Sequence, residues 1–317
     1  MTREHIVLTY GLCAFFIEKY GGKTMMNRKE YEDSIYRENI KDIINDIYYS
    51  NASYTTKISR SRTLAEYIIR RLIKQSPNSE LALGDDRTRN ELKKAGVTEK
   101  FFWNAYNAVR KAGNKATHSK NYNQLTVADF SEVNTAVITL YAYLFFDYFK
   151  KYKFGSNLDI VTAFSFLPPD MRFIVLRELV FNNYDCDVYT ISKFCLSLIK
   201  SMGAEKARRW VIENRGRLSS ISMPYGSEDI NKKIEEYGID NIRMVMDEIQ
   251  ETVYDYLIRE IQKPELCFLN PENLPYHSFE EAKIYYEEHG VVSGNSEDVR
   301  QFNALMQYVY TGRQDEK

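Results

Sequence analysis

Residues 101–118 have the sequence FFWNAYNAVRKAGNKATH, and this stretch decides how the surrounding chain can fold. At about 100° per residue, its small apolar side chains fall on one narrow stripe of a helix. The stripe consists of Phe101, Ala105, Ala108, Ala112 and Ala116. An apolar stripe needs a neighbouring apolar surface to cover it, so the stretch predicts a helix packed inside a helical bundle.

The same spacing of apolar residues continues on both sides of this stretch. It predicts helices over Arg28–Tyr49, Lys57–Gln75, Asp85–Ala95 and from Thr126 to about Lys151. Thr126-x-x-Asp129 has the spacing of a capping box, which starts the last of these helices. We expect the second of these helices to carry Arg60, Arg62, Arg70, Arg71 and Lys74 on its outer face. Helices joined by short connections favour a four-helix bundle.

The second half of the chain is also predicted to be helical. The pattern indicates helices over Asp170–Phe181, Val188–Met202, Ala204–Asn214, Asp240–Gln262, Phe279–Glu288 and Glu297–Tyr310. Turn signals at 154–168 suggest a junction between two units. The expected fold class is therefore all-α, a four-helix bundle followed by a second helical domain. The expected parts are a peripheral segment 1–27, a basic bundle 28–153 and an acidic helical domain 154–317.

Composition excludes several classes of protein. The 317 residues are 44% hydrophobic and 27% charged, which excludes a wholly disordered chain. The 14 glycines and 7 prolines provide few turn signals, which disfavours an all-β sandwich. The four cysteines are scattered, which disfavours a disulfide framework or a zinc site and favours a reducing cytoplasm. The apolar run Ile6–Ile17 is too short to span a bilayer, so we expect no membrane segment.

Charge is balanced over the whole chain but not within its parts. Residues 57–153 hold 18 Lys and Arg against 9 Asp and Glu, a net charge of +9. Residues 154–317 hold 18 against 27, a net charge of −9. A basic segment of this size is a candidate site for RNA or another polyanion. The alternative is that the two halves neutralise each other, or that the acidic half binds a basic protein partner.

One row of polar side chains has the composition of a phosphate-handling site. Arg110, Asn114 and His118 succeed one another at i, i+4 and i+8, on the side of the helix away from the alanine stripe. A histidine can move a proton near neutral pH, an arginine stabilises charge on a phosphate, and an asparagine can orient either group. The alternative is that Gly113 ends the helix as a C-cap, which would leave His118 with a structural role.

Residues 61–67 (SRTLAEY), followed by 110–118 (RKAGNKATH), resemble the HEPN superfamily, the higher eukaryotes and prokaryotes nucleotide-binding proteins. The resemblance covers about residues 30–150 and is strongest to the uncharacterised HEPN-like helical domain of bacterial restriction and defence proteins. It implies a four-helix bundle that often dimerises, with the two motifs facing each other. It also implies that active members are endoribonucleases that work without a metal ion.

The family motif has an arginine directly before the polar residue, and this chain differs there. Asn114 and His118 match the polar residue and the histidine, but Gly113 occupies the arginine position. Arg110, one turn earlier, is then the expected source of the guanidinium. Lys111, Lys115, Lys120, Arg70 and Arg71 are the expected additional phosphate-binding residues.

We therefore expect a cytoplasmic RNA-binding protein of a bacterial defence or toxin system, acting as a homodimer and as a metal-independent endoribonuclease with no cofactor. The alternative is a non-catalytic HEPN-like adaptor or sensor that binds nucleic acid or a protein partner. The position of Arg110, Asn114 and His118 separates the two, because catalysis needs these side chains accessible in a cleft or at a dimer interface.

Overall fold

The computed structural model describes residues 34–117, 125–182, 184, 187–224, 235, 238, 251–267, 269 and 279–314. Every regular element in these residues is a helix, and the one bridge between extended residues joins Ser222 and Thr252. The expected all-α class is confirmed for this part of the chain.

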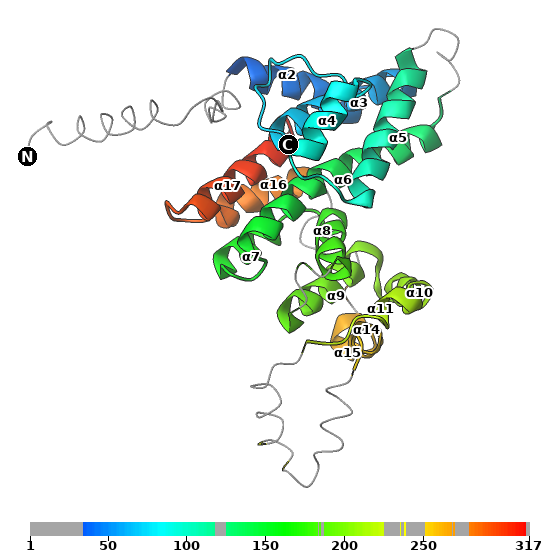
Figure 1. Ribbon diagram of the computed structural model, residues 1–317, viewed down its shortest axis with the longest axis vertical. Coiled ribbons are helices and arrows are strands. Elements are labelled where there is room, and N and C mark those ends of the chain that lie inside the picture. Colours follow the sequence, from blue (N-terminus) through cyan, green and yellow to red (C-terminus); the bar gives the residue numbers. More distant parts are fainter. Residues whose placement is uncertain are drawn as a thin grey trace, which may run out of the picture.

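Helix α6 (Val127–Tyr152) is the central element of the molecule (Figure 1). It begins at the expected capping box, in which Thr126 and Asp129 each accept a hydrogen bond from the other's backbone. Residues 141–146 (YAYLFF) are all buried. A helix that is apolar on every side must be covered on every side. Helices α3, α5, α8 and α17 pack against α6, and the start of α5 lies beside its C-terminal half, where Phe101 contacts Phe146.

The helices that precede α6 lie together at one end of the molecule. They are α2 (Ser34–Ile44), the π-helix η2 (Asn45–Tyr49), α3 (Tyr54–Leu72), α4 (Asp86–Lys94) and α5 (Lys100–Thr117). Helix α3 packs against both α5 and α6, and α5 packs along α6. Ser53 caps α3 by accepting a hydrogen bond from the backbone of Thr56 at 3.2 Å, so this helix begins three residues earlier than expected.

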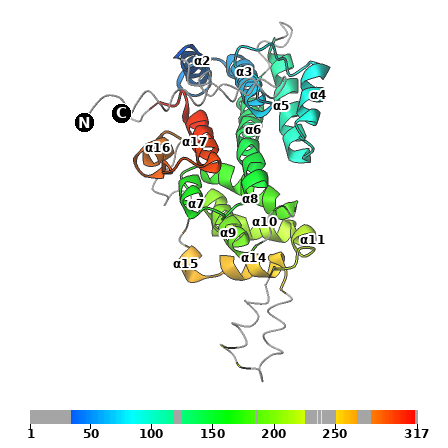
Figure 2. The same ribbon diagram turned by 60° about the vertical axis from the view of Figure 1, so that its left-hand side comes forward.

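The helices that follow α6 form the rest of the molecule. They are α7 (Leu158–Phe164), α8 (Pro169–Phe181), α9 (Val188–Met202), α10 (Ala204–Glu213), α11 (Arg215–Leu218), α14 (Val253–Ile261), α15 (Pro264–Cys267), α16 (Phe279–Tyr285), the π-helix η6 (Tyr286–Gly290) and α17 (Glu297–Tyr310). Helices α16 and α17 lie on the side of α6 opposite α5, as Figure 2 shows. No helix among the described residues is both long enough and apolar enough to cross a membrane.

One hydrophobic core connects the two halves of the chain. Its buried side chains extend without interruption from Tyr36 in α2 to Tyr310 in α17. Arg313 strengthens this connection, because its guanidinium lies 4.1 Å from the ring centre of Tyr48 and 4.3 Å from that of Phe279. Glu280 pairs with this guanidinium at 3.6 Å. The expected domain boundary at residue 154 stays a prediction. In the described residues, buried side chains from before and after residue 154 belong to the same hydrophobic core.

A buried charge cluster holds the start of α5 against α6. Glu99 is 7% exposed and accepts hydrogen bonds from Lys150 at 2.7 Å, from Tyr143 at 2.6 Å and from the backbone of Thr98 at 3.0 Å. Burial raises the pKa of Glu99, but the bonds from Lys150 and Tyr143 outweigh it, so the pKa lies below its usual value. We call Glu99, Tyr143 and Lys150 the Glu99 cluster.

Candidate phosphate site

Helix α5 runs without a break from Lys100 to Thr117 and so includes Arg110, Gly113 and Asn114. Gly113 therefore does not terminate it, and the C-cap alternative is wrong. Its buried residues are Phe102, Ala105, Tyr106, Val109, Gly113 and Ala116. Of the expected stripe, Ala105 and Ala116 are buried but Phe101, Ala108 and Ala112 are only half-buried. The buried face is rotated away from that stripe, because α3 and α6 both pack against this helix. Arg110 and Asn114 lie at the edge of the buried face and are half-buried, rather than pointing away from the core as expected.

At Gly113 the side chain of Arg62, which comes from α3, lies directly against α5. A Cβ atom at this position would lie 2.6 Å from Cδ and 2.8 Å from Cβ of Arg62. Real Cβ atoms do not approach carbon atoms this closely, so only glycine lets the aliphatic part of Arg62 lie flat across α5. Gly113 thus makes room for an arginine from the neighbouring helix.

The guanidinium of Arg62 reaches the motif directly. Its Nη1 donates a hydrogen bond to Oδ1 of Asn114 at 2.5 Å, and its Nε lies 3.4 Å from Oε1 of Glu66. The Arg62 side chain is 21% exposed. The expectation that Arg62 belongs to the outer face of its helix is therefore wrong. Helix α3 turns this side chain toward α5 because it follows the buried Ile58 by one turn.

Arg110 brings a second guanidinium to the same place. It precedes Asn114 by one helical turn, so the two side chains are neighbours on the helix surface. Its Nε is buried without a hydrogen-bond partner among the described residues. Burial raises the pKa of the Tyr106 hydroxyl, while the nearby charges of Arg89 and Arg110 act to lower it. We call Arg62, Arg110 and Asn114 the arginine–asparagine cluster.

Some N–H donors of the two arginines in this cluster have no hydrogen-bond partner among the described residues. A guanidinium carries five N–H donors. Within the part of the chain that the structure describes, Arg62 uses donors toward Asn114 and Glu66, and Arg110 has no hydrogen bond or ion pair. Among the described residues, Glu66 is the only carboxylate bonded to the cluster, and its Oε1 also accepts a hydrogen bond from the backbone of Leu83 at 3.4 Å. Two cations beside one anion leave a net positive charge, which favours binding of an anion.

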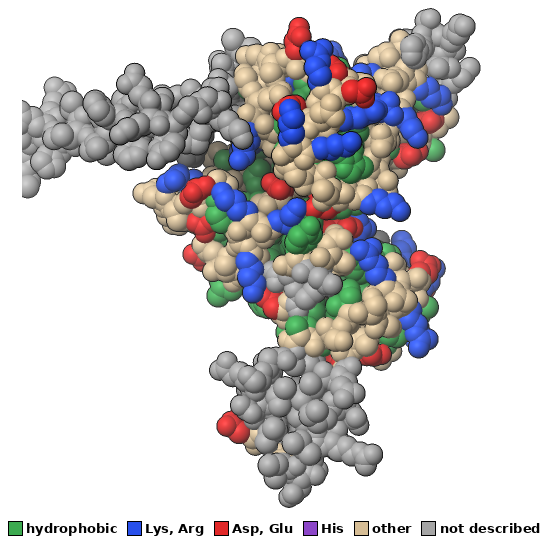
Figure 3. All heavy atoms as spheres, viewed as in Figure 1, with side chains coloured by type: hydrophobic (Ala, Val, Ile, Leu, Met, Phe, Trp, Pro, Cys, Tyr) green, Lys and Arg blue, Asp and Glu red, His purple; other side chains and the backbone are tan. Residues whose placement is uncertain are grey.

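The other expected site residues lie in different surroundings. Lys111 and Lys115 are exposed beside the cluster, and Lys115 lies 3.6 Å from Asp129 at the start of α6. His118 and Lys120 lie outside the described residues. Lys and Arg side chains are visible over α2 to α5 and also over the rest of the described face, as Figure 3 shows.

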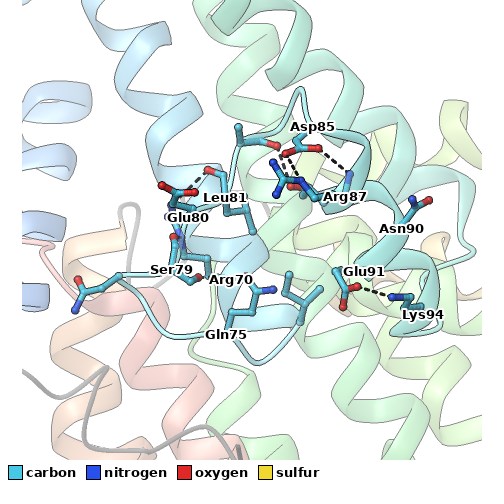
Figure 4. A pocket seen from close by; sticks show the side chains of 14 residues that line it. Arg70, Gln75, Ser79, Glu80, Leu81, Asp85, Arg87, Asn90, Glu91 and Lys94 are labelled. Carbon is cyan, nitrogen blue, oxygen red and sulfur yellow. Dashed lines mark hydrogen bonds and ion pairs between the residues drawn. The ribbon is translucent and has the colours of Figure 1, made fainter. Parts of the chain in front are cut away.

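Arg70 and Arg71 serve the packing of α3. Arg70 donates to the backbone carbonyls of Ser79 at 2.9 Å and Leu81 at 3.4 Å, and Arg71 lies 5.5 Å from the ring centre of Tyr308. Arg70 borders a hollow of about 850 Å³ between α3, residues 75–82 and α4 (Figure 4). Charged groups around this hollow pair with each other, as Lys94 does with Glu91 at 2.7 Å. These two arginines are therefore not part of the arginine–asparagine cluster.

Metal chemistry has no visible basis in the described residues. They contain no group of three or more His, Cys, Asp or Glu side chains arranged to hold a metal ion. Cys195 is buried, and burial raises its pKa to about 12, which leaves it without nucleophilic character at neutral pH. The arrangement can therefore bind and polarise an anion through guanidinium and amide groups.

Comparison of the chain with family models, curated proteins and solved structures gave no significant match.

Proposed function

We propose that this protein binds RNA at the arginine–asparagine cluster and cleaves it without a metal ion, as its resemblance to the HEPN superfamily implies. The observation that carries the proposal is the hydrogen bond from Arg62 to Asn114. It brings a guanidinium to Asn114, the residue that an arginine should precede by this resemblance. Gly113 occupies the arginine position, but Arg62 still supplies a cation to the motif.

The proposed reaction is a transfer of the phosphodiester within the RNA strand. The ribose 2′-oxygen forms a bond to phosphorus, the bond to the 5′-oxygen of the next nucleotide breaks, and His118 moves the protons. Arg62 and Arg110 stabilise the negative charge that develops on the phosphate oxygens. Asn114 orients the phosphate through its amide, and Lys111, Lys115 and Lys120 add affinity that does not depend on sequence.

The biological setting follows from the same resemblance. We propose a cytoplasmic protein of a bacterial defence or toxin system that acts as a homodimer. A dimer would place two arginine–asparagine clusters near each other, so that the bound RNA contacts cationic side chains from both protomers.

The nuclease proposal is tested by incubating the purified chain with total RNA in the presence of a chelator, beside the variant His118→Ala. We expect RNA fragments from the wild-type protein and intact RNA with the variant. Equal cleavage by both proteins, or no cleavage by either, would reject the nuclease.

A non-catalytic adaptor is the second candidate, and one observation favours it. Arg62 already has partners in Asn114 and Glu66, so the cluster also serves to hold α3 against α5. The adaptor would bind RNA or a protein partner without changing it. RNA that is bound with equal affinity by wild type and His118→Ala, and is left uncut by both, would favour this function.

A further inference from the structure

Two aromatic rings stack at the end of the bundle that carries the arginine–asparagine cluster. Tyr54 is the first residue of α3, and Phe130 lies in the first turns of α6. Their ring centres are 6.1 Å apart, and the ring planes differ by 29°. Tyr54 is 40% exposed, and among the described residues the only other large aromatic side chains that are exposed are Tyr184 and Tyr189. The Nζ atom of Lys57 lies 5.7 Å from the centre of the Phe130 ring.

This aromatic pair is continuous with the arginine–asparagine cluster. Asp129, the neighbour of Phe130 in sequence, lies 3.6 Å from Lys115 of α5, which is the neighbour of Asn114. Along α3, Arg62 follows Tyr54 by about two helical turns. The start of α3, the end of α5 and the start of α6 thus present aromatic and cationic side chains on one end of the bundle.

We propose that Tyr54 and Phe130 stack an unpaired nucleobase, with Lys57 binding a phosphate beside it, so that the protein prefers single-stranded RNA. The inference rests on the proposed RNA binding and names the form of RNA bound. Aromatic rings flanked by basic groups bind single strands because every base has a π-face and every nucleotide a phosphate. Bases in a duplex are stacked on each other and do not reach such a ring.

The chain provides a matched control far from the cluster. Tyr189 of α9 is 37% exposed, its ring centre lies 6.2 Å from that of Phe154, and Lys193 lies 5.2 Å over its ring. This group has the same composition as Tyr54, Phe130 and Lys57, but it lies in α9 and not beside the arginine–asparagine cluster. Any effect of removing an exposed tyrosine on solubility or general adhesion should therefore be the same at both positions.

The experiment measures binding of a labelled oligouridine and of a duplex RNA to the full chain, by fluorescence anisotropy, in a His118→Ala background that prevents cleavage. The variants are Tyr54→Ala, Tyr54→Trp and Tyr189→Ala. An oligonucleotide without bases serves as a third ligand, since it keeps the phosphates but cannot stack. Circular dichroism of each variant shows that the helices are retained.

We expect Tyr54→Ala to weaken oligouridine binding at least fivefold, the loss that removal of one base stack produces. Tyr54→Trp should restore it, Tyr189→Ala should leave it unchanged, and the affinities for the duplex and for the base-free ligand should not change in Tyr54→Ala.

An equal loss of oligouridine affinity in Tyr54→Ala and Tyr189→Ala, or an equal loss for the base-free ligand, would overturn the stacking proposal. If Arg62→Met weakens binding and Tyr54→Ala does not, only the stacking proposal fails. If the wild-type chain binds no RNA, the proposed function fails with it.

Discussion

Helix α5 carries a charged cluster at each end, and the two clusters differ in how completely their charges are paired. In the Glu99 cluster, one buried carboxylate accepts hydrogen bonds from one ammonium at 2.7 Å and one hydroxyl at 2.6 Å, so the two charges cancel. In the arginine–asparagine cluster, two guanidinium groups lie near one carboxylate, and the Nε of Arg110 is buried without a partner. A buried polar atom without a partner costs stability. The comparison shows that the charges are paired in the first cluster and only partly paired in the second, and this difference is the basis of the proposal that the second cluster binds an anion.

The largest expected effect is at the Glu99 cluster. Glu99→Ala should lower the free energy of unfolding by about 3–5 kcal/mol, because it leaves the ammonium of Lys150 without its partner in a largely buried place. Urea denaturation gives this value. Lys150→Met should have a similar effect, and the double variant should lose less than the sum of the two. A loss below about 1 kcal/mol in both single variants would mean that this cluster does not hold α5 to α6.

A smaller effect is expected where the two helices meet at Gly113. Gly113→Ala should destabilise the protein by about 1–3 kcal/mol, because the new Cβ would collide with the side chain of Arg62. In an Arg62→Ala background the same change should instead stabilise the protein by up to about 1 kcal/mol, since alanine favours helix over glycine. Thermal unfolding of the four proteins forms a double-mutant cycle.

Gly216→Ala is the control for this cycle. Gly216 lies in α11, and a Cβ atom there would meet nothing within 4 Å. It should show only the small gain from helix propensity in both backgrounds. The same destabilisation by Gly113→Ala with and without Arg62 would show that Gly113 does not make room for that side chain.

The dependence of stability on pH should reveal the contribution of the Glu99 cluster. The pKa of Glu99 is lowered by folding, so its contribution is complete above its unfolded value of about 4.5 and is lost as pH falls through the folded pKa. The pKa of Lys150 is lowered by burial but raised further by Glu99, so its contribution is lost as pH rises beyond about 10.5. In Glu99→Gln, both losses should be weaker than in wild type when urea midpoints are compared across pH. Identical profiles for the two proteins would contradict this assignment.

Most helices follow from the sequence alone because their apolar residues repeat at helical spacing. The described helices α9 and α17 have the bounds that this spacing predicts, and the capping box of Thr126 and Asp129 forms as expected. These features depend on residues close together in the chain, so local physical rules are sufficient to find them.

The position of Arg62 could not be found in the same way. A helical pattern separates polar from apolar positions, and Arg62 was therefore assigned to the outer face. The sequence did carry a signal, because Arg62 follows Ile58 by four residues and precedes Ile69 by seven, which places it beside the buried stripe. What makes burial possible is a glycine 51 residues later, on another helix. A contact between two helices depends on the sequences of both helices, so the apolar pattern of one helix alone does not predict it.

RNA binding at the arginine–asparagine cluster requires that free N–H donors of Arg62 bind RNA phosphate. The direct measurement is the salt dependence of RNA affinity for the full chain carrying Arg62→Met, which keeps much of the aliphatic stem and removes the charge. Arg60→Met on the same helix is the control, because Arg60 pairs with Asp46 at 2.8 Å and is 48% exposed. We predict that the slope of log affinity against log salt falls by about 1 for Arg62→Met and stays at the wild-type value for Arg60→Met. Equal slopes in wild type and Arg62→Met would contradict the claim and leave Arg62 as a structural contact between α3 and α5.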